Sequence, residues 1–531
     1  MKRLLAMAIV LSMVMVLFAA CGSDPTPPAP TPTPPGGDNG ETGNKVGGVL
    51  RVAFASNLET PDPQLARTGT ALNYSSSITD ALFGMNEDGS PRPLLAREWE
   101  CSPDGLELTI HLQENVKFHD GEPFNAEAVR WNIQDRLLNE DFSNNKRPSL
   151  LNINDVEVVS DYTLIFHLDE TDAILLETLT GSQYGMVSPK AVQEMGEDFA
   201  DNPVGLGPFV FKEFIPDSHA RVERFDDYWQ GAPYLDAIEF KIIPEESTRV
   251  LELEMGNVDV LLYTAPREAA RLESDFNVVS GAKLGLVTLA MNLRMPVFQD
   301  IRMRQALGYA MDRQLIIDEV NHGYPDMGAF GIPPDCRGFD PTLENFDYDP
   351  EKAGELLDDL GWVMGSDGFR YKDGEKLEFV LRSSSAATVL MTTEVVQQML
   401  ADVGIDSEIY MTESAAFNQD MRSENFEIGY WGLGGYVHPG VMAFALHSDY
   451  YWNPSRHYVE EIDSVIDQAM KEMDDDRLIE LTEEYQRLIK EHLPAIHLWH
   501  AGSIWVMNPR VNDIFIDAAN YMYFEKAWVS E

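Results

Sequence analysis

The stretch from residue 202 to residue 259 constrains the fold of this chain more than any other part of its sequence. Near its start, residues 205–208 read Gly-Leu-Gly-Pro, and this combination of free and locked φ angles predicts a tight turn. Farther on, apolar and polar residues alternate through Ile238, Phe240 and Ile242, which is typical of a strand with one buried face. The stretch therefore predicts a half-buried sheet.

The order of the pieces in this stretch is specific. A glycine–proline turn and a strand precede the aromatic segment 227–236, Asp-Tyr-Trp-Gln-Gly-Ala-Pro-Tyr-Leu-Asp, and a second strand and a short helix follow it. In this order they resemble the large extracytoplasmic solute-binding proteins of ABC importers, family 5, the peptide-, dipeptide- and nickel-binding class. Segments 94–129, 298–313 and 349–362 extend the resemblance over nearly all of the chain after residue 45.

The resemblance implies an α/β, two-lobed periplasmic-binding-protein-like fold of class II type, with an additional β-rich subdomain inserted in lobe one. The chain length agrees with two lobes, because 531 residues exceed what one hydrophobic core usually supports. Alternation through 106–112 predicts antiparallel strands, and strand, helix and strand within 379–410 predict a parallel α/β lobe. The expected ranges are 46–84, 85–184 (the inserted subdomain) and 185–282 for lobe one, 283–492 for lobe two, and 493–531 for the C-terminal return to lobe one.

The first residues of the chain predict a destination outside the cytoplasm. Two basic residues precede an apolar run at 4–18, which is shorter than the ~20 residues that a membrane span requires. Residues 1–20 resemble a lipoprotein signal peptide, which implies cleavage before Cys21 and lipidation of its thiol. An unmodified cysteine after ordinary signal cleavage is the alternative. Residues 21–45, rich in Pro, Thr and Gly, predict a spacer, so we expect a protein anchored by lipid on the outer face of the cell membrane or in the periplasm.

The charge balance excludes one class of partner. The chain has 39 basic and 88 acidic residues, a net charge of −49, whereas nucleic-acid binding requires stripes of Lys and Arg. We expect no nucleic acid and no cofactor, a monomer, and the permease and ATPase subunits of an importer as partners. Cys101 and Cys336 are permitted to pair in an oxidising compartment, but the resemblance places them in different lobes.

Residues 427–439 form the main candidate for solute binding. A strand there runs into a glycine-rich turn, and Trp431 and Tyr436 are expected as exposed aromatics that offer apolar area with polar tips. In peptide-binding relatives, an Asp just before the Tyr pairs with the α-ammonium of the peptide. Here Gly435 occupies that position and His438 replaces a second acidic residue. Because a buried ammonium without its carboxylate is costly, these two changes weigh against the standard binding of free-amine peptides.

Four further residues are candidates through the resemblance. The loop after the first strand, with Ser56 and Asn57, reaches the ligand cleft in the family, although a surface turn is the alternative. Nickel-chelate binders place an arginine near Tyr184, which has no counterpart here, and a histidine for which His447 is the nearest match. We therefore expect an oligopeptide or a dipeptide as solute. The alternatives are nickel or another metal chelate held by His438 or His447, an opine, or a saccharide.

An extracytoplasmic peptidase is the alternative of another class. His492, His497 and His500 do not have the spacing of a zinc site, and Ser143 to Lys146 match Ser-x-x-Lys without a later Lys-Thr-Gly. We therefore expect a binding protein and no enzyme. Its lobes are expected to close by a hinge in two crossover strands, near 284–291 and 493–499.

Overall fold

The computed structural model describes most of the chain from Lys45 onward, which forms one compact unit. The described residues are 45, 47–139, 142, 150, 152–327, 330–334, 336, 338–343, 345–423, 425–433, 438–439, 446–449, 453–455 and 459–530. The expected signal peptide, Cys21 and the spacer lie outside these residues, and so do Gly435 and Tyr436. None of the helices in the described ranges combines the length and the apolar character that a membrane crossing requires.

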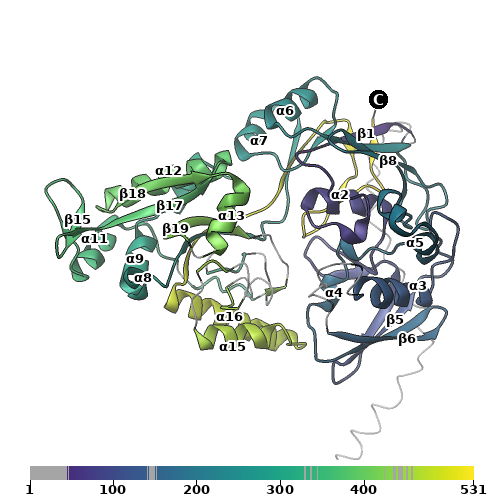
Figure 1. Cartoon of the computed structure of the whole chain (residues 1–531), viewed down its shortest axis with the longest axis horizontal. Helices are drawn as coiled ribbons and strands as arrows, with labels where there is room; N and C mark the ends of the chain where they lie inside the picture. Colours follow the sequence, from purple (N-terminus) through teal and green to yellow (C-terminus); the bar gives the residue numbers. More distant parts are fainter. Residues whose placement is uncertain are drawn as a thin grey trace, which may run out of the picture. The chain divides into compact units, whose positions relative to one another are not determined.

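Lobe one is built on a seven-stranded mixed sheet (Figure 1). Its strands, in spatial order, are β12 (Asn277–Ser280), β21 (Ile504–Met507), β11 (Val260–Leu261), β1 (Val49–Phe54), β10 (Ala237–Ile242), β9 (His219–Arg224) and β8 (Phe209–Ile215). The central strand β1 is parallel to β10 and β11, and the outer neighbours are antiparallel. Two of the strands, β8 and β10, are those that the alternation in 202–259 predicts.

Lobe one's core forms where aromatic side chains of the sheet meet a helix. Phe54 and Phe240 stack with their ring centroids 5.1 Å apart, and Tyr74 of α2 (Gly69–Ile78) meets Phe240 edge to face. The other elements of this lobe are η1 (Pro63–Leu65), α5 (Pro189–Met195), η5 (Gly196–Asp201), α6 (Glu246–Glu254), α7 (Pro266–Leu272), β22 (Val511–Asn512), β23 (Phe515–Ile516), β24 (Met522–Tyr523) and β25 (Trp528–Val529).

One buried carboxylate ties lobe one to the end of the chain. Asp259 is fully buried and accepts hydrogen bonds from the backbone N–H and the guanidinium of Arg51, each at 2.9 Å. Its other oxygen accepts from Arg510 at 2.8 Å. Removal of either arginine would leave the buried carboxylate with an uncompensated charge, which is costly. The Asp259 carboxylate thus links β1, the first strand of the chain, to the segment that follows β21 near the C-terminus.

The region between β1 and β8 contains a separate antiparallel sheet of four strands. In spatial order they are β4 (Ala96–Cys101), β5 (Glu107–Leu112), β7 (Thr163–Leu168) and β6 (Ile153–Ser160). Leu108, Ile110 and Leu112 face the core, as their alternation predicts, and Asn125 caps α3 by accepting from the backbone N–H of Ala128. Its other elements are β2 (Phe83–Met85), β3 (Pro91–Pro93), α3 (Ala126–Arg130), η2 (Trp131–Leu137), α4 (Leu175–Thr178) and η4 (Ser182–Tyr184).

Lobe two is built on a five-stranded sheet. In spatial order its strands are β18 (Asp406–Thr412), β17 (Glu378–Ser384), β19 (Ile428–Leu433), β13 (Gly285–Met291) and β20 (Ala495–Ala501). Strand β17 is parallel to β18 and β19, as strand, helix and strand predict, and α12 (Ala387–Asp402) packs on β17 and β18 (Figure 1). Asp300 and Asp349 cap α9 and α11, as their positions before apolar runs predict.

The remaining elements of lobe two are mostly helices. They are α8 (Pro296–Gln299), α9 (Ile301–Tyr309), α10 (Arg313–Glu319), α11 (Pro350–Asp359), β14 (Val363–Met364), β15 (Arg370–Lys372), β16 (Glu375–Lys376), α13 (Ser414–Arg422), α15 (Glu460–Ala469) and α16 (Asp475–His492). Helices α15 and α16 pack against each other (Figure 1). Cys336 is buried in this lobe and Cys101 is exposed on β4, and the two cysteines form no disulfide.

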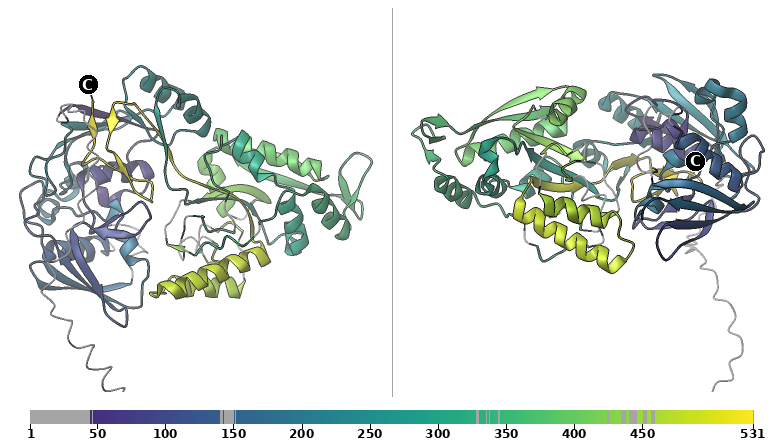
Figure 2. Two further views of the ribbon diagram at one scale, coloured as in Figure 1. Left: turned by 180° about the vertical axis from the view of Figure 1, so that it is seen from behind. Right: turned by 60° about the horizontal axis from the view of Figure 1, so that its bottom comes forward.

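Two chain segments pass side by side between the lobes, as the teal and yellow chains do in Figure 2. Strand β12 continues through 281–284 into β13, and β20 continues through 502–503 into β21. Each sheet pairs the two strands antiparallel, and the Gly281 N–H donates to the Ser503 carbonyl at 2.9 Å between the sheets. Strand β20 pairs with β13 in the sheet of lobe two, and β21 pairs with β12 in the sheet of lobe one.

Glycine at 502 is required by this close passage. A Cβ at Gly502 would lie 2.4 Å from the carbonyl oxygen of Gly281 and 2.9 Å from that of Ala282. These are backbone atoms, so we expect Gly502→Ala to force the two segments apart and to lower the free energy of unfolding by about 1–3 kcal/mol. Urea unfolding measures this. The control is Gly308→Ala in helix α9. A Cβ at Gly308 would lie 3.5 Å from its nearest neighbour, the ring of Phe346, so we expect no decrease in the free energy of unfolding.

Candidate functional site

A cavity of about 1370 Å³ is lined by residues of both lobes and by the segments that connect them. Lobe one contributes the turn between β2 and β3, the end of β12 and the loop that leads to β23. Lobe two contributes Asp326, Cys336, His438 and the start of α16, and residues 281–284 complete the lining. Small-molecule sites are concave and often lie between domains, so this cavity is the candidate site.

Asp517 is the most buried carboxylate of the lining. It lies in the hairpin between β23 and β24, where only 3 % of the residue is exposed. The backbone N–H of Tyr521 donates to it at 2.9 Å and the Tyr523 hydroxyl at 3.0 Å. Burial raises the pKa of Asp517 to about 6, because desolvation of the charged form outweighs these hydrogen bonds and the nearby Arg92.

The turn between β2 and β3 places two more carboxylates on the lobe-one side. Gly89 has a φ of +82°, which L side chains rarely adopt, and this conformation closes the turn. The Asp88 carboxylate accepts from the backbone N–H and the hydroxyl of Ser90, and these bonds lower the pKa of Asp88. Glu87, next to it, is exposed.

The connecting segments contribute a cation that is already paired. The Lys283 ammonium lies 2.6 Å from a carboxylate oxygen of Asp326. The backbone of Asp326 exchanges two hydrogen bonds with His500 of β20, at 2.9 and 2.7 Å, which fixes the position of the carboxylate. Because the pair lies at the passage between the lobes, its geometry depends on both connecting segments.

The lobe-two side is formed by the start of α16. Asp474 caps this helix by accepting from the backbone N–H of Arg477 at 2.9 Å, and Asp475 begins its first turn. Acidic residues at this end are stabilised by the helix dipole. The first turn therefore presents Asp475 at the cavity, together with Glu472 just before the helix.

The charges around the cavity have nearly one sign. Among the lining residues that the structure describes, eight are Asp or Glu and one is Lys. The acidic set is Glu87, Asp88, Glu177, Asp326, Glu472, Asp475, Asp513 and Asp517. A concave surface lined by one sign of charge focuses the electrostatic potential and attracts ions of the opposite sign.

The structure places Trp431 differently from the expectation. With 3 % exposure, it is not an exposed aromatic but packs with Phe417, Met421 and Phe426. The physical reason is helix α13, which supplies Phe417 and Met421 and covers this face of β19. Trp431 does not line the cavity in this structure, and its role toward a ligand stays a prediction.

The other expected site residues are scattered. His438 lines the cavity. Ser56 bonds Thr70 at 3.1 Å, and Asn57 bonds Asp217 at the surface. Tyr184 is buried in the core of the inserted subdomain. Of the expected residues that the structure describes, it therefore places only His438 at this cavity.

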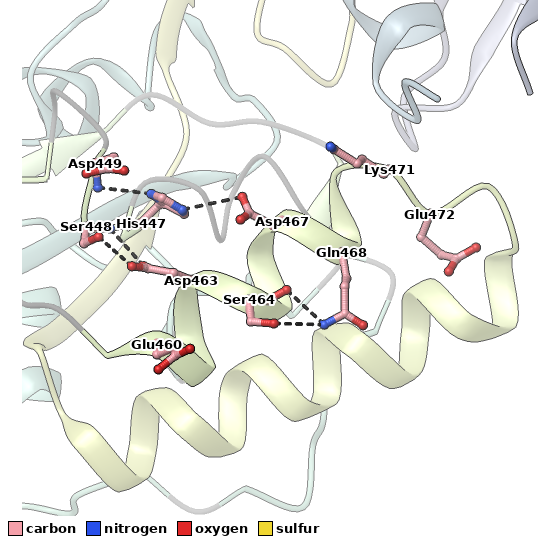
Figure 3. A pocket seen from close by; sticks show the side chains of 10 residues that line it. All are labelled: His447, Ser448, Asp449, Glu460, Asp463, Ser464, Asp467, Gln468, Lys471 and Glu472. Atoms are coloured by element: carbon pink, nitrogen blue, oxygen red, sulfur yellow. Dashed lines mark hydrogen bonds and ion pairs between the residues drawn. The ribbon is translucent and has the colours of Figure 1, made fainter. Parts of the chain in front are cut away.

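His447 lies in a second hollow, of about 660 Å³, along α15 (Figure 3). There its ring contacts the Asp467 carboxylate at 3.5 Å, and the backbone N–H of Asp449 donates to it at 3.1 Å. This hollow follows one helix of lobe two and its neighbouring loop, so it lacks the second wall that the larger cavity has. The described residues contain no cluster of His, Cys, Asp and Glu suited to a metal ion.

Sequence reasoning missed Asp517, Lys283 and Asp326, which come from three distant parts of the chain. No motif or spacing joins them, because only the tertiary structure brings the hairpin after β23 next to the connecting segments. One signal was available for Asp517: it lies between the aromatic residues Phe515 and Tyr523 in a stretch near the C-terminus that the resemblance assigns to lobe one.

Comparison with known proteins identifies the family. Residues 90–463 match the family described as "Bacterial extracellular solute-binding proteins, family 5 Middle". The chain belongs to this family. As a family 5 protein, it is an extracytoplasmic substrate-binding protein of ABC importers and not an enzyme, and the two-lobed α/β fold expected from the sequence is confirmed.

Individual relatives cover nearly all of the described chain. The glutathione-binding protein GsiB of Salmonella typhi is 29% identical over 462 residues, which are 84% of this chain and 88% of that protein. NikA of Brucella suis, solved in complex with Fe(III)-EDTA, has a TM-score of 0.82 at 24% identity and covers 91% of this chain and 100% of its own. The oligopeptide-binding protein AppA of Bacillus subtilis, solved with a nonapeptide, has a TM-score of 0.76 at 22% identity, over 92% and 100%.

The raised pKa of Asp517 predicts how stability changes with pH. Its folded pKa of about 6 exceeds the unfolded value, which is about 3.9. The stability from this group is therefore complete below about pH 4 and is lost as the pH rises through about 6. We expect Asp517→Asn to remove this pH dependence. Between these pH values, the free energy of unfolding of the variant is expected to fall by roughly 1–3 kcal/mol less than that of the parent protein.

Urea unfolding at several pH values measures the effect. The control is Asp513→Asn, since the Asp513 side chain lies in the preceding loop, between β22 and β23, but is 56% exposed; its free energy of unfolding is expected to change with pH as in the parent protein. If the free energy of unfolding of Asp517→Asn fell with pH as steeply as that of the parent protein, the prediction would be contradicted.

Proposed function

We propose that this chain captures a small solute in the cavity between its lobes and delivers it to the permease of an ABC importer. The observation that supports the proposal is the cavity itself, because about 1370 Å³ is enough for a drug-sized solute or a short peptide. Its lining comes from both lobes, so a movement of the lobes changes its size. Family membership and the relatives' solute complexes agree with this use.

Closure of the lobes is part of the proposal. Two segments connect them, 281–284 and 502–503, and a short connection of this kind absorbs backbone rotations in hinge motions. Asn520 joins the two segments, since its side chain donates to the Ala282 carbonyl at 3.1 Å and accepts from the Ser503 N–H at 3.3 Å. The closed form is the form that the permease would recognise.

An oligopeptide or dipeptide is the solute class we propose first. AppA, which shares the fold, was solved with a nonapeptide, and GsiB is named as a glutathione-binding protein. Gly435 removes the carboxylate expected to pair with an α-ammonium, so here the carboxylates of the cavity would replace it. A metal chelate, an opine or a saccharide is the second candidate, and the NikA complex with Fe(III)-EDTA favours the chelate among them.

A bulky side chain in the cavity tests the site. Ser280 lines the cavity at the exposed end of β12, so we expect Ser280→Trp to fill part of it and to leave the fold intact. Native mass spectrometry of the purified parent protein is expected to show one solute per chain, released on denaturation, and the variant is expected to lose it. Ser464→Trp, in the hollow along α15, is the control and is expected to keep the solute. Retention by Ser280→Trp would place the binding site elsewhere.

We also propose that a lipid on Cys21 anchors the protein to the membrane. Several acyl chains at ~0.8 kcal/mol per buried methylene make a stable anchor. Expression of the full chain in bacteria with a labelled fatty acid is expected to label the protein and to place it in the membrane fraction. Cys21→Ala is expected to lose both properties, whereas Cys101→Ala, the control, is expected to keep them. Label retained by Cys21→Ala would overturn the proposal.

A further inference from the structure

The cavity is specialised by its charge. We propose that the solute carries a net positive charge on ammonium or guanidinium groups, which the carboxylates around the cavity hold. The inference rests on the proposed function, since it assigns the chemical class of the solute in that site. The site itself stands on the cavity and on family membership, and the carboxylates decide only what enters it.

The carboxylates come from both lobes. Lobe one contributes Glu87 and Asp517, and lobe two contributes Asp326, which is paired with Lys283, and Asp475 at the start of α16. A solute between the lobes therefore meets negative charge on each side. A solute with several cationic groups would meet carboxylates of both lobes at once, and this would favour the closed form by drawing the lobes together.

The described part of the cavity lining carries little positive charge. Lys283 is the only Lys or Arg among its described lining residues, and its ammonium lies 2.6 Å from Asp326. Against the described lining, an anionic solute would meet only a cation that Asp326 already pairs, so this lining would not compensate its desolvation. This lining disfavours carboxylate-rich chelates and acidic peptides.

The described lining is more one-sided in charge than the chain as a whole. The chain has 39 basic residues for 88 acidic ones, whereas the described lining has one for eight. The hollow along α15 provides the internal comparison, because it also carries acidic residues but is lined by residues of lobe two alone; of these, it shares Glu472 with the cavity. Residues of that hollow serve as matched controls for a change in total charge.

The first test compares tripeptide probes of one length and three charges. Isothermal titration of the full chain, after release of any bound solute, is carried out with trilysine, trialanine and triglutamate, and with spermidine as a cation that is not a peptide. We expect a cationic probe to bind at least about tenfold more tightly than the neutral and anionic probes at low salt. We also expect this advantage to shrink as the ionic strength rises, since screening shortens the reach of the charges to about 8 Å at physiological ionic strength.

The second test removes charge at the cavity and elsewhere. The double variant Glu87→Gln with Asp475→Asn removes two charges from opposite walls. The control Glu460→Gln with Asp467→Asn removes the same number from the hollow along α15, and each pair includes the first residue of a helix in lobe two. We expect the dissociation constant of the bound cationic probe to rise about threefold to tenfold in the cavity variant, and to change less than about twofold in the control.

Each outcome decides the inference. Preference for trilysine supports a cationic peptide, and preference for spermidine supports a small polyamine. Equal or tighter binding of trialanine or triglutamate overturns the inference, as does equal weakening in the cavity variant and its control. A co-purified solute that is neutral or anionic also overturns it but leaves the proposed function standing. Absence of any bound solute, together with no binding of any probe, overturns the proposed function itself.

Discussion

The structure depends on the close passage of two backbone segments between its lobes. Strands β12 and β21 pair in lobe one, and their continuations β13 and β20 pair in lobe two, so that a single antiparallel ribbon runs through both sheets. Gly281 and Gly502 lie where the ribbon leaves one sheet and enters the other, because a Cβ at either position would overlap its neighbours. Because the ribbon is the connection between the sheets, its twist and its bending would govern how the walls of the cavity approach each other.

Around this ribbon, the charged groups occupy two kinds of environment. Asp259 is buried with two guanidiniums and holds lobe one together, so its charge is fully compensated within the protein. Asp517 is buried with neutral donors, so its charge is compensated only in part and the pKa rises. The first arrangement stabilises the fold. The second leaves a negative potential at the cavity, which a bound cation would neutralise. We therefore assign Asp259 a structural role and Asp517 a role in binding.

Local patterns predicted much of the fold. Asn125, Asp300 and Asp349 cap the helices that their positions predict, since a cap depends only on residues within one turn. Of the expected site residues that the structure describes, only His438 lines the cavity, and the roles of all of them toward a ligand stay predictions. Trp431 follows a strand pattern that is compatible with exposure, but α13, which precedes β19 in the chain, covers it. Ser56 and Asn57 lie on the expected loop, yet the loop bonds Thr70 and Asp217 and does not line the cavity.

The sequence by itself determined the family, the α/β class, the inserted subdomain's strands and the strong acidity, because each of these is a property of composition or of short-range order. The tertiary structure alone decided where the acidity is concentrated. Asp517, Asp326 and Asp475 are far apart in the chain, and only the return of β20 and β21 beside β13 and β12 brings their segments to one cavity. The physical reason is that a binding surface between lobes is a long-range property, set by how sheets are connected, whereas caps and alternation are set within a few residues.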